Sequence, residues 1–253
     1  MTPQTKLSPP ESQSMNPPET LQGKVALITG ANRGIGLAIA QKLAKMGASV
    51  SLCARDEKAL EGAVAEIERQ GGRSLAVRAD VTRRGEIEEL VAKTEQRFGT
   101  IEILVNNAGI GYFGPTHEAS ENAWDTVLDT NLKSVFLLSK AVAPGMMRLG
   151  GGHIVNIGSI AGKSSFAGGG IYCASKWGLL GLTQCMAEDL RPHGIRVSAV
   201  LPGSVNTEFS PHVGKDTKKM LQPHDVAHAV AAIVTQEPQS FISEIVLRPT
   251  QKP

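Results

Sequence analysis

The 253-residue sequence contains only three cysteines, no strong charge of either sign and no long apolar run. Cys53, Cys173 and Cys185 form neither a C-x-x-C pair nor a metal-ligand spacing, and an odd number argues against a disulfide framework. The formal charge is +2 with Lys and Arg scattered along the chain, which excludes the basic stripe typical of nucleic-acid-binding proteins. We therefore expect no nucleic-acid partner.

Signals for membranes and metals are also missing. No apolar run is long enough to span a bilayer, and the N-terminus lacks the charged-then-apolar order of a secretion signal. His224 and His228 lie four residues apart without a Glu or a third ligand, so a surface helix is a better interpretation than a zinc site. We expect a cytoplasmic protein with no membrane partner and no metal.

The chain divides into a short arm and one long domain. Residues 1–20 hold five prolines among polar residues and are predicted to be a disordered N-terminal arm. In residues 21–253, short apolar runs alternate with amphipathic stretches. Strands are predicted at residues 24–29, 49–54, 74–79, 101–105, 153–158, 195–200 and 241–247. Helices are predicted at residues 35–46, 57–69, 86–98, 119–149 with a bend or break at Pro144-Gly145, 171–190 and 226–234. This alternation predicts a three-layer α/β, doubly wound sandwich with a seven-stranded parallel sheet.

A glycine-rich turn joins the first strand to the first helix. Its spacing is G-x-x-x-G-x-G, from Gly30 through Gly34 to Gly36, and differs from the G-x-G-x-x-G dinucleotide fingerprint. Backbone N–H groups at such a helix start favour an anion, and the missing side chains let a pyrophosphate approach. We interpret the turn as a nucleotide site. A second glycine-rich stretch, residues 158–164, is one residue short of a P-loop, which disfavours ATP hydrolysis.

Tyr172 and Lys176 lie four residues apart on a predicted helix and so share one face. An ammonium within a few ångströms favours the phenolate and could make the tyrosine a general acid or base near working pH. A Tyr and a Lys at this spacing also occur by chance in many helices, where the Tyr is simply buried and the Lys is solvated. The surrounding motifs decide between these interpretations.

Taken in order, the motifs resemble those of the short-chain dehydrogenase/reductase family, NAD(P)-dependent oxidoreductases built on a single Rossmann-like domain. The resemblance runs from about residue 23 to residue 248. The expected cofactor-binding residues are Gly30, Asn32, Arg33, Gly34, Ile35 and Gly36 in the glycine turn, Arg55, the adenine-contacting Asp80-Val81, Asn107, Ala108 and Gly109 after the fourth strand, Tyr172, Lys176, and Pro202, Gly203, Val205 and Thr207 in the nicotinamide-binding turn. The expected catalytic residues are Asn131, Ser159, Tyr172 and Lys176.

The resemblance also implies a role for each catalytic residue. Tyr172 would give a proton to the substrate carbonyl oxygen during reduction, and Ser159 would hold that carbonyl. Lys176 would lower the Tyr172 pKa and bind the nicotinamide ribose. Asn131 would hold a helix distortion and an ordered water, although it could also be an ordinary helix residue. A homotetramer or homodimer packed through the helices around Asn131 and Tyr172 is implied as well.

The end of the second strand predicts the choice of cofactor. NAD enzymes usually place an acid there to bind the ribose 2′-hydroxyl, whereas this sequence has Arg55. Arg55 and Arg33 could together bind a 2′-phosphate. We therefore predict NADP(H); the alternative is that both arginines are solvated surface charges.

The sequence thus predicts an NADPH-dependent carbonyl or 3-oxoacyl reductase acting on a small-molecule carbonyl substrate. The C-terminus lacks the D-G-G-like ending common in acyl-carrier-protein reductases, which counts against a fatty-acid substrate. Two alternatives remain: an NADP-binding redox sensor without turnover, and an NAD-dependent alcohol dehydrogenase. We expect residues 111–113, 163–170 and 206–222 to shape the substrate pocket, the last of them as a lid.

Overall fold

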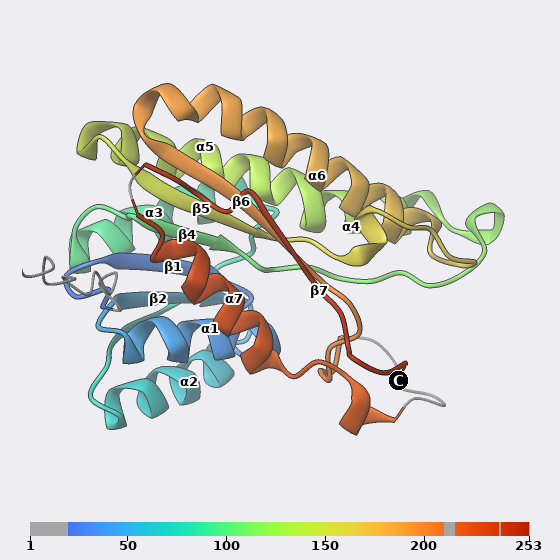
Figure 1. Cartoon of the computed structure of the whole chain (residues 1–253), viewed down its shortest axis with the longest axis horizontal. Helices are drawn as coiled ribbons and strands as arrows, with labels where there is room; N and C mark the ends of the chain where they lie inside the picture. Colours follow the sequence, from blue (N-terminus) through green and yellow to red (C-terminus); the bar gives the residue numbers. More distant parts are fainter. Residues whose placement is uncertain (1–19, 210–215, 238, 253) are drawn as a thin grey trace, which may run out of the picture.

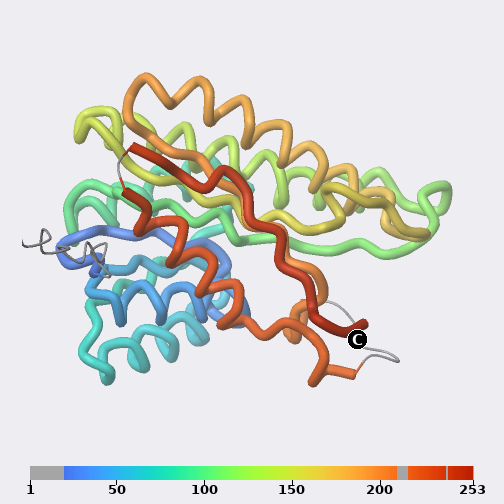
Figure 2. Tube along the Cα trace, viewed as in Figure 1, coloured from blue at the N-terminus to red at the C-terminus, as the bar shows by residue number. Residues whose placement is uncertain are grey.

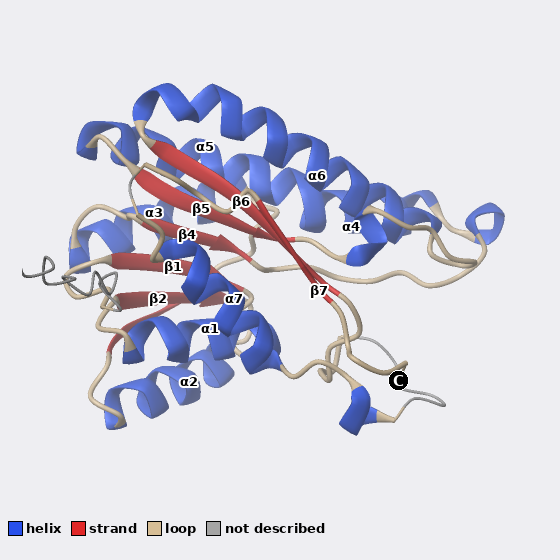
Figure 3. Cartoon of the chain, viewed as in Figure 1, coloured by secondary structure: helices blue, strands red, loops and turns tan. Residues whose placement is uncertain are grey.

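A computed structural model describes residues 20–209, 216–237 and 239–252. The predicted disordered arm, residues 1–20, lies outside the described residues except for Thr20, as do residues 210–215 of the predicted lid. Within the described part, helices alternate with strands that form one seven-stranded sheet (Figures 1 and 3). The strand order is β3-β2-β1-β4-β5-β6-β7, and every neighbouring pair is parallel. The Rossmann-like three-layer architecture expected from the sequence is confirmed.

The five inner strands of the sheet are buried almost throughout on both faces, as parallel strands covered by helices must be, whereas the two edge strands are partly exposed. Side chains alternate between two core clusters: Ala26 and Ile28 belong to one, Val25 and Leu27 to the other. The strands are β1 (Val25–Thr29), β2 (Ser49–Ala54), β3 (Arg73–Arg78), β4 (Ile103–Asn106), β5 (Gly152–Ile157), β6 (Ile195–Pro202) and β7 (Glu244–Leu247).

The helices cover the two faces of the sheet in separate groups (Figure 1). One face packs against α1 (Gly34–Lys45), α2 (Glu57–Arg69) and α7 (Pro223–Val234). The other packs against α3 (Arg84–Phe98), α5 (Ser134–Leu149) and α6 (Gly170–Leu190), with α4 (Glu121–Leu128) beside α6. This division produces the two large apolar cores of the domain.

The strand order reverses direction between β1 and β4. The chain first builds outward from β1 to β2 and β3, and then returns to pair β4 with the other side of β1. In Figure 2 the blue trace of β1 and the green trace of β4 lie side by side near the centre of the molecule. The connection after β1 and the connection after β4 run in opposite directions along the sheet, so a crevice opens between them at the carboxyl ends of the strands. Ligands of such folds bind in this crevice.

The predicted long helix 119–149 has an interruption, but not at the proline. A π-helical turn, Asp129–Lys133, separates α4 from α5, and Pro144 lies inside α5 without ending it. Of the predicted bend or break at Pro144-Gly145, the break is therefore wrong. Proline removes one backbone hydrogen bond, while the neighbouring Ala143, Gly145 and Met146 are buried and keep the helix packed.

Two smaller predictions also differ from the structure. The seventh strand begins at Glu244 rather than residue 241, and the preceding stretch is held by Arg196 and Ser198, whose side chains donate to carbonyl groups of Gln236 (2.9 Å) and Ile242 (2.6 Å). In the sequence, Trp124, Val127 and Leu128 have the spacing of core residues; Val127 is buried, whereas 45% of Trp124 is exposed. That exposed ring lies on the outer side of α4.

Candidate active site

The ends of β1 and β4 are joined by side-chain hydrogen bonds. The Thr29 hydroxyl accepts from the backbone N–H of Asn107 and of Ala108, each at 3.1 Å. The Asn107 amide donates to the carbonyls of Thr29 (2.8 Å) and Gly30 (3.2 Å). The glycine turn and the segment after β4 therefore form one rigid wall of the crevice.

The glycine turn is packed so closely that side chains would not fit. Gly30 has φ +62°, and a Cβ there would lie 3.0 Å from the Ala108 Cα. A Cβ on Gly36 would lie 2.5 Å from the Asn107 Nδ2 and closer still to the Gly30 carbonyl oxygen. Helix α1 begins without a side-chain cap and without an acidic residue in its first turn. Its free N–H groups and positive dipole end suit a phosphate group.

A cavity of about 340 Å³ opens beside this turn. Its wall brings together nine of the predicted cofactor-binding residues: Gly30, Asn32, Arg33, Arg55, Asp80, Val81, Asn107, Ala108 and Gly109. Arg33 and Arg55 come from different loops and reach the same cavity. Arg33 is paired with Glu208, which follows β6, and both of these side chains are largely exposed.

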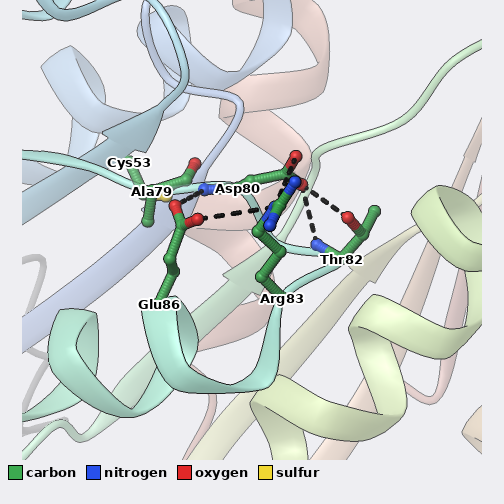
Figure 4. Close-up of polar contacts among 6 residues, drawn as sticks. All are labelled: Cys53, Ala79, Asp80, Thr82, Arg83 and Glu86. Atoms are coloured by element: carbon green, nitrogen blue, oxygen red, sulfur yellow. Dashed lines mark hydrogen bonds and ion pairs between the residues drawn. The ribbon is translucent and has the colours of Figure 1, made fainter.

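Asp80 lies at the end of β3 with its carboxylate held in place (Figure 4). Its Oδ1 accepts from the Thr82 backbone N–H (2.9 Å) and hydroxyl (2.8 Å), and its own N–H donates to Glu86 (2.8 Å). Burial raises the Asp80 pKa, but the Thr82 hydrogen bonds and the charges of Arg55 and Arg83 outweigh it and hold that pKa below its ordinary value. The group is a fixed anion at neutral pH.

Cys53, near the end of β2, lies close to Asp80 and Glu86 (Figure 4). Burial, together with the negative charges of Asp80 and Glu86, raises the Cys53 thiol pKa to about 12. A thiol with that pKa is protonated and unreactive at neutral pH. All three cysteines are free, as the sequence predicts.

Tyr172 and Lys176 share the inner face of α6, and both are almost fully buried. The Lys176 Nζ lies 5.8 Å from the centre of the Tyr172 ring and donates to the Ile157 carbonyl at 2.9 Å. Ser159 follows β5 two residues later, and its hydroxyl accepts from the Ala161 N–H at 3.1 Å. The three side chains therefore converge from β5 and α6 on one point at the carboxyl edge of the sheet.

Burial shifts both titratable groups toward their neutral forms. Burial raises the Tyr172 pKa, a hydrogen bond with the Ser159 side chain opposes this rise, and Cys173 adds to it. Burial lowers the Lys176 pKa to about 8. In this geometry the phenol is a neutral proton donor at pH 7, since burial outweighs the hydrogen bond with Ser159. The predicted lowering of the Tyr172 pKa by Lys176 stays a prediction.

Asn131 lies at the centre of the π turn and is buried. Its Oδ1 accepts from the Ile110 N–H (2.8 Å), and its Nδ2 donates to the Ile110 carbonyl (2.9 Å) and to the Ser175 hydroxyl (3.0 Å). Ser175 in turn donates to the Tyr172 carbonyl (2.7 Å). Asn131 thus connects the segment after β4 to the helix that carries Tyr172.

A second cavity, of about 470 Å³, contains the Tyr172 site. Its lining contains the remaining predicted residues that face the crevice: Ile35, Ser159, Tyr172, Lys176, Pro202, Gly203, Val205 and Thr207. Asn107 and Gly109 line both cavities, so the two form one trough. Gly34, Gly36 and Asn131 line neither cavity.

Sequence reasoning missed several residues that build this site. Thr29 and Ser175 support the wall and the catalytic helix, and Ile157 supplies the acceptor for Lys176. None belongs to a motif that points to chemistry. A hydroxyl at a buried strand end is the one signal that could have identified Thr29.

Known proteins were compared with this chain. Residues 24–218 match the short chain dehydrogenase family. A 3-oxoacyl-[acyl-carrier-protein] reductase from Vibrio cholerae is 37% identical over 227 residues, 86% of this chain and 92% of that protein. A metagenomic short-chain oxidoreductase solved in complex with NADP is 44% identical, with a TM-score of 0.82, covering 92% of this chain and 99% of that chain. An alcohol dehydrogenase from the archaeon Thermococcus sibiricus, complexed with 5-hydroxy-NADP, is 33% identical with a TM-score of 0.84, covering 91% and 98%.

Within residues 20–209, 216–237 and 239–252, no three His, Cys, Asp or Glu side chains gather as metal ligands would. None of the helices in the described part of the chain combines the length and the apolar character needed to cross a membrane.

Proposed function

Because this chain belongs to the short-chain dehydrogenase family, an oxidoreductase family that uses a nicotinamide cofactor, we propose that it reduces a ketone or aldehyde with NADPH and that Tyr172 is the proton donor. The observation that carries the proposal is the neutral, buried phenol of Tyr172 between Ser159 and Lys176, at the end of a trough shaped for a dinucleotide. The bound nicotinamide supplies the hydride.

The residues of the chain hold the carbonyl group and manage its proton. The Ser159 and Tyr172 hydroxyls line one cavity and can both donate to a carbonyl oxygen, polarising it. Tyr172 then transfers its proton as negative charge develops on that oxygen. Lys176, directed inward, places a positive charge close to the phenol and stabilises the phenolate that remains. Asn131 is a positioning residue, since it acts on this site through Ser175 and Ile110.

The proposed choice of NADPH rests on the two arginines of the first cavity. Arg33 and Arg55 line it from different loops, and neither is buried, so both guanidinium groups can move onto a dianion. The carboxylate of Asp80 is already held by Thr82, within reach of the adenine end. Two of the similar solved structures contain NADP or a derivative of it, which supports the same choice.

The function is tested by mixing the protein with NADPH and a panel of ketones, aldehydes and β-ketoesters while following the loss of nicotinamide absorbance. Turnover with NADPH supports the reductase. Tight NADPH binding without turnover of any compound would favour a redox sensor, which has no need of Ser159, Tyr172 and Lys176. Oxidation of alcohols with NAD in preference to NADP would favour the alcohol dehydrogenase.

We also propose that a second copy of the chain covers the outer side of α4, α5 and α6. Trp124, Phe136 and Trp177 are each about half exposed there, at 45%, 45% and 53%. A groove at Phe136 is lined by apolar residues and one ion pair: Leu128, Asp129, Leu132, Lys133, Phe136, Gly178 and Leu182. Exposed aromatic groups of this extent are typical of protein interfaces. This face carries the π turn of Asn131, so association would brace the active site.

A further inference from the structure

Two phenylalanines pack against the ring of Tyr172, and a third packs against one of them. The Phe113 and Phe209 rings lie 5.6 and 5.8 Å from the Tyr172 ring, measured between centroids, at interplanar angles of 58° and 52°. Phe166 lies 6.3 Å from Phe113. The three come from different segments, after β4, before α6 and after β6. With six phenylalanines in the whole sequence, half of them gather at this one cavity.

Glycines fix the positions of these rings. A Cβ on Gly111 would lie 2.6 Å from the Phe113 ring and 3.4 Å from the Phe209 ring. A Cβ on Gly169 would lie 2.6 Å from the Phe166 ring. Each ring therefore rests on bare backbone, and any other residue at these two positions would displace it. Rings seated in this way present a defined surface rather than a disordered one.

The rings are not part of the core. Phe113, Phe166 and Phe209 are 44%, 48% and 43% exposed. Each ring therefore leaves much of its surface open beside the reacting group. Exposed aromatic surface of this kind is stabilised when a flat apolar group covers it, and tilted or offset contacts between aromatic rings add further attraction.

Charge is nearly absent from the same cavity. Among the described residues that line it, Lys176 is the one charged side chain, and its ammonium is directed at the Ile157 carbonyl. The other polar side chains described in the lining are uncharged, among them the hydroxyls of Ser159, Ser164 and Ser165. Among these described residues, a carboxylate or phosphate on the substrate would find no cation other than Lys176 and would lose its hydration.

We propose that the substrate is a neutral carbonyl compound with an aromatic ring attached to the carbonyl carbon, and that Phe113 and Phe209 select it. This inference rests on the proposed function. The substrate ring lies against the phenylalanines while its carbonyl oxygen faces Ser159 and Tyr172. In the reaction the C=O π bond breaks, the carbon gains a hydride from NADPH, and the oxygen gains the Tyr172 proton, which solvent replaces. The products are a benzylic alcohol and NADP⁺.

The test compares two methyl ketones that differ in aromaticity, acetophenone and cyclohexyl methyl ketone. Comparing each variant with wild type cancels the difference in intrinsic reactivity. For Phe113→Leu and Phe209→Leu, which keep an apolar side chain but remove the ring, we expect KM for acetophenone to rise by about 10-fold and KM for the cyclohexyl ketone to change by less than about 3-fold. Phe98→Leu is the matched control, because Phe98 ends α3 and does not line the cavity.

The outcomes separate this inference from the proposed function. An equal change in both KM values for the two pocket variants, or turnover of the cyclohexyl ketone and not of acetophenone by wild type, would overturn the aromatic preference and leave the reductase intact. No turnover of any carbonyl compound, with NADPH bound, would overturn both. NADPH affinity, measured by nicotinamide fluorescence, should stay unchanged in all three variants.

Discussion

The ammonium of Lys176 lies 5.8 Å from the centre of the Tyr172 ring and donates to the Ile157 carbonyl, not to the phenol. Lys176 therefore acts on Tyr172 through its charge. Since burial lowers the Lys176 pKa to about 8, that charge is lost just above neutral pH. We expect kcat for reduction to fall as pH rises through about 8, because the developing phenolate loses its positive neighbour. Lys176→Met should abolish this step in the kcat–pH profile.

Deprotonation of Lys176, which should lower kcat as pH rises, should raise the stability of the fold. The folded-state pKa of Lys176, about 8, is below the ordinary value of 10.5, so between these values the unfolded chain binds more protons. The free energy of unfolding therefore rises by roughly 3 kcal/mol at most as the pH increases from about 8 to 10.5. Urea denaturation of wild type and Lys176→Met at pH 7.5 and 10 measures the difference; a constant difference in unfolding free energy would contradict the assigned pKa.

Cofactor choice is tested at the end of β2. Arg55→Asp removes one guanidinium from the 2′-phosphate side of the first cavity and adds an acceptor for a ribose hydroxyl. We expect NADPH affinity to fall by about 10- to 100-fold and NADH affinity to rise. Isothermal titration with both cofactors is the measurement. Unchanged NADPH affinity in this variant would show that Arg55 is a solvated surface charge.

Glu208 should compete with the 2′-phosphate of the cofactor for Arg33. Its carboxylate pairs with Arg33, and since both side chains are exposed, the pair contributes little to folding. Glu208→Gln should free Arg33 and remove a negative charge near the 2′-phosphate, so NADPH binds a few-fold tighter while NADH binding stays the same. Glu188→Gln breaks a comparably exposed pair with Arg191 and is the control. Equal tightening of both cofactors would exclude a role at the 2′-phosphate.

Association of two copies is tested on the outer side of α6. Trp177→Lys places a charge on the exposed apolar face and should convert the wild-type oligomer to a smaller species, with reduced kcat because the π turn loses its support. Leu149→Lys, at the end of α5, is equally exposed and should leave the mass unchanged. Sedimentation velocity distinguishes the two. A monomeric wild type at micromolar concentration would contradict the proposed interface.

Sequence patterns predicted the parts of this molecule that depend on local chemistry. The strand at residues 49–54 and the helix at residues 57–69 match the structure residue for residue, because apolar periodicity and the flanking glycines act locally. The glycine turn and the Tyr172-Lys176 pair were found for the same reason, since each depends on spacing within one element.

Features that depend on contacts between residues far apart in the sequence could not be predicted from sequence patterns. Pro144 breaks helices by propensity, but burial of its neighbours keeps α5 intact. The direction of the Lys176 ammonium depends on the Ile157 carbonyl, which belongs to another element. The three pocket phenylalanines lie on segments that the sequence identified as pocket-forming, yet their convergence on one cavity beside Tyr172 is a property of the folded chain alone.

The most direct test of the proton donor is Tyr172→Phe, which removes one hydroxyl and keeps the ring between Phe113 and Phe209. NADPH affinity and the turnover of a reducible ketone should be measured on the same preparation. We predict a fall in kcat of about 10²- to 10⁴-fold, the usual contribution of a general acid, with NADPH affinity unchanged. A variant that binds NADPH normally and keeps wild-type kcat would contradict the assignment of Tyr172 as the acid.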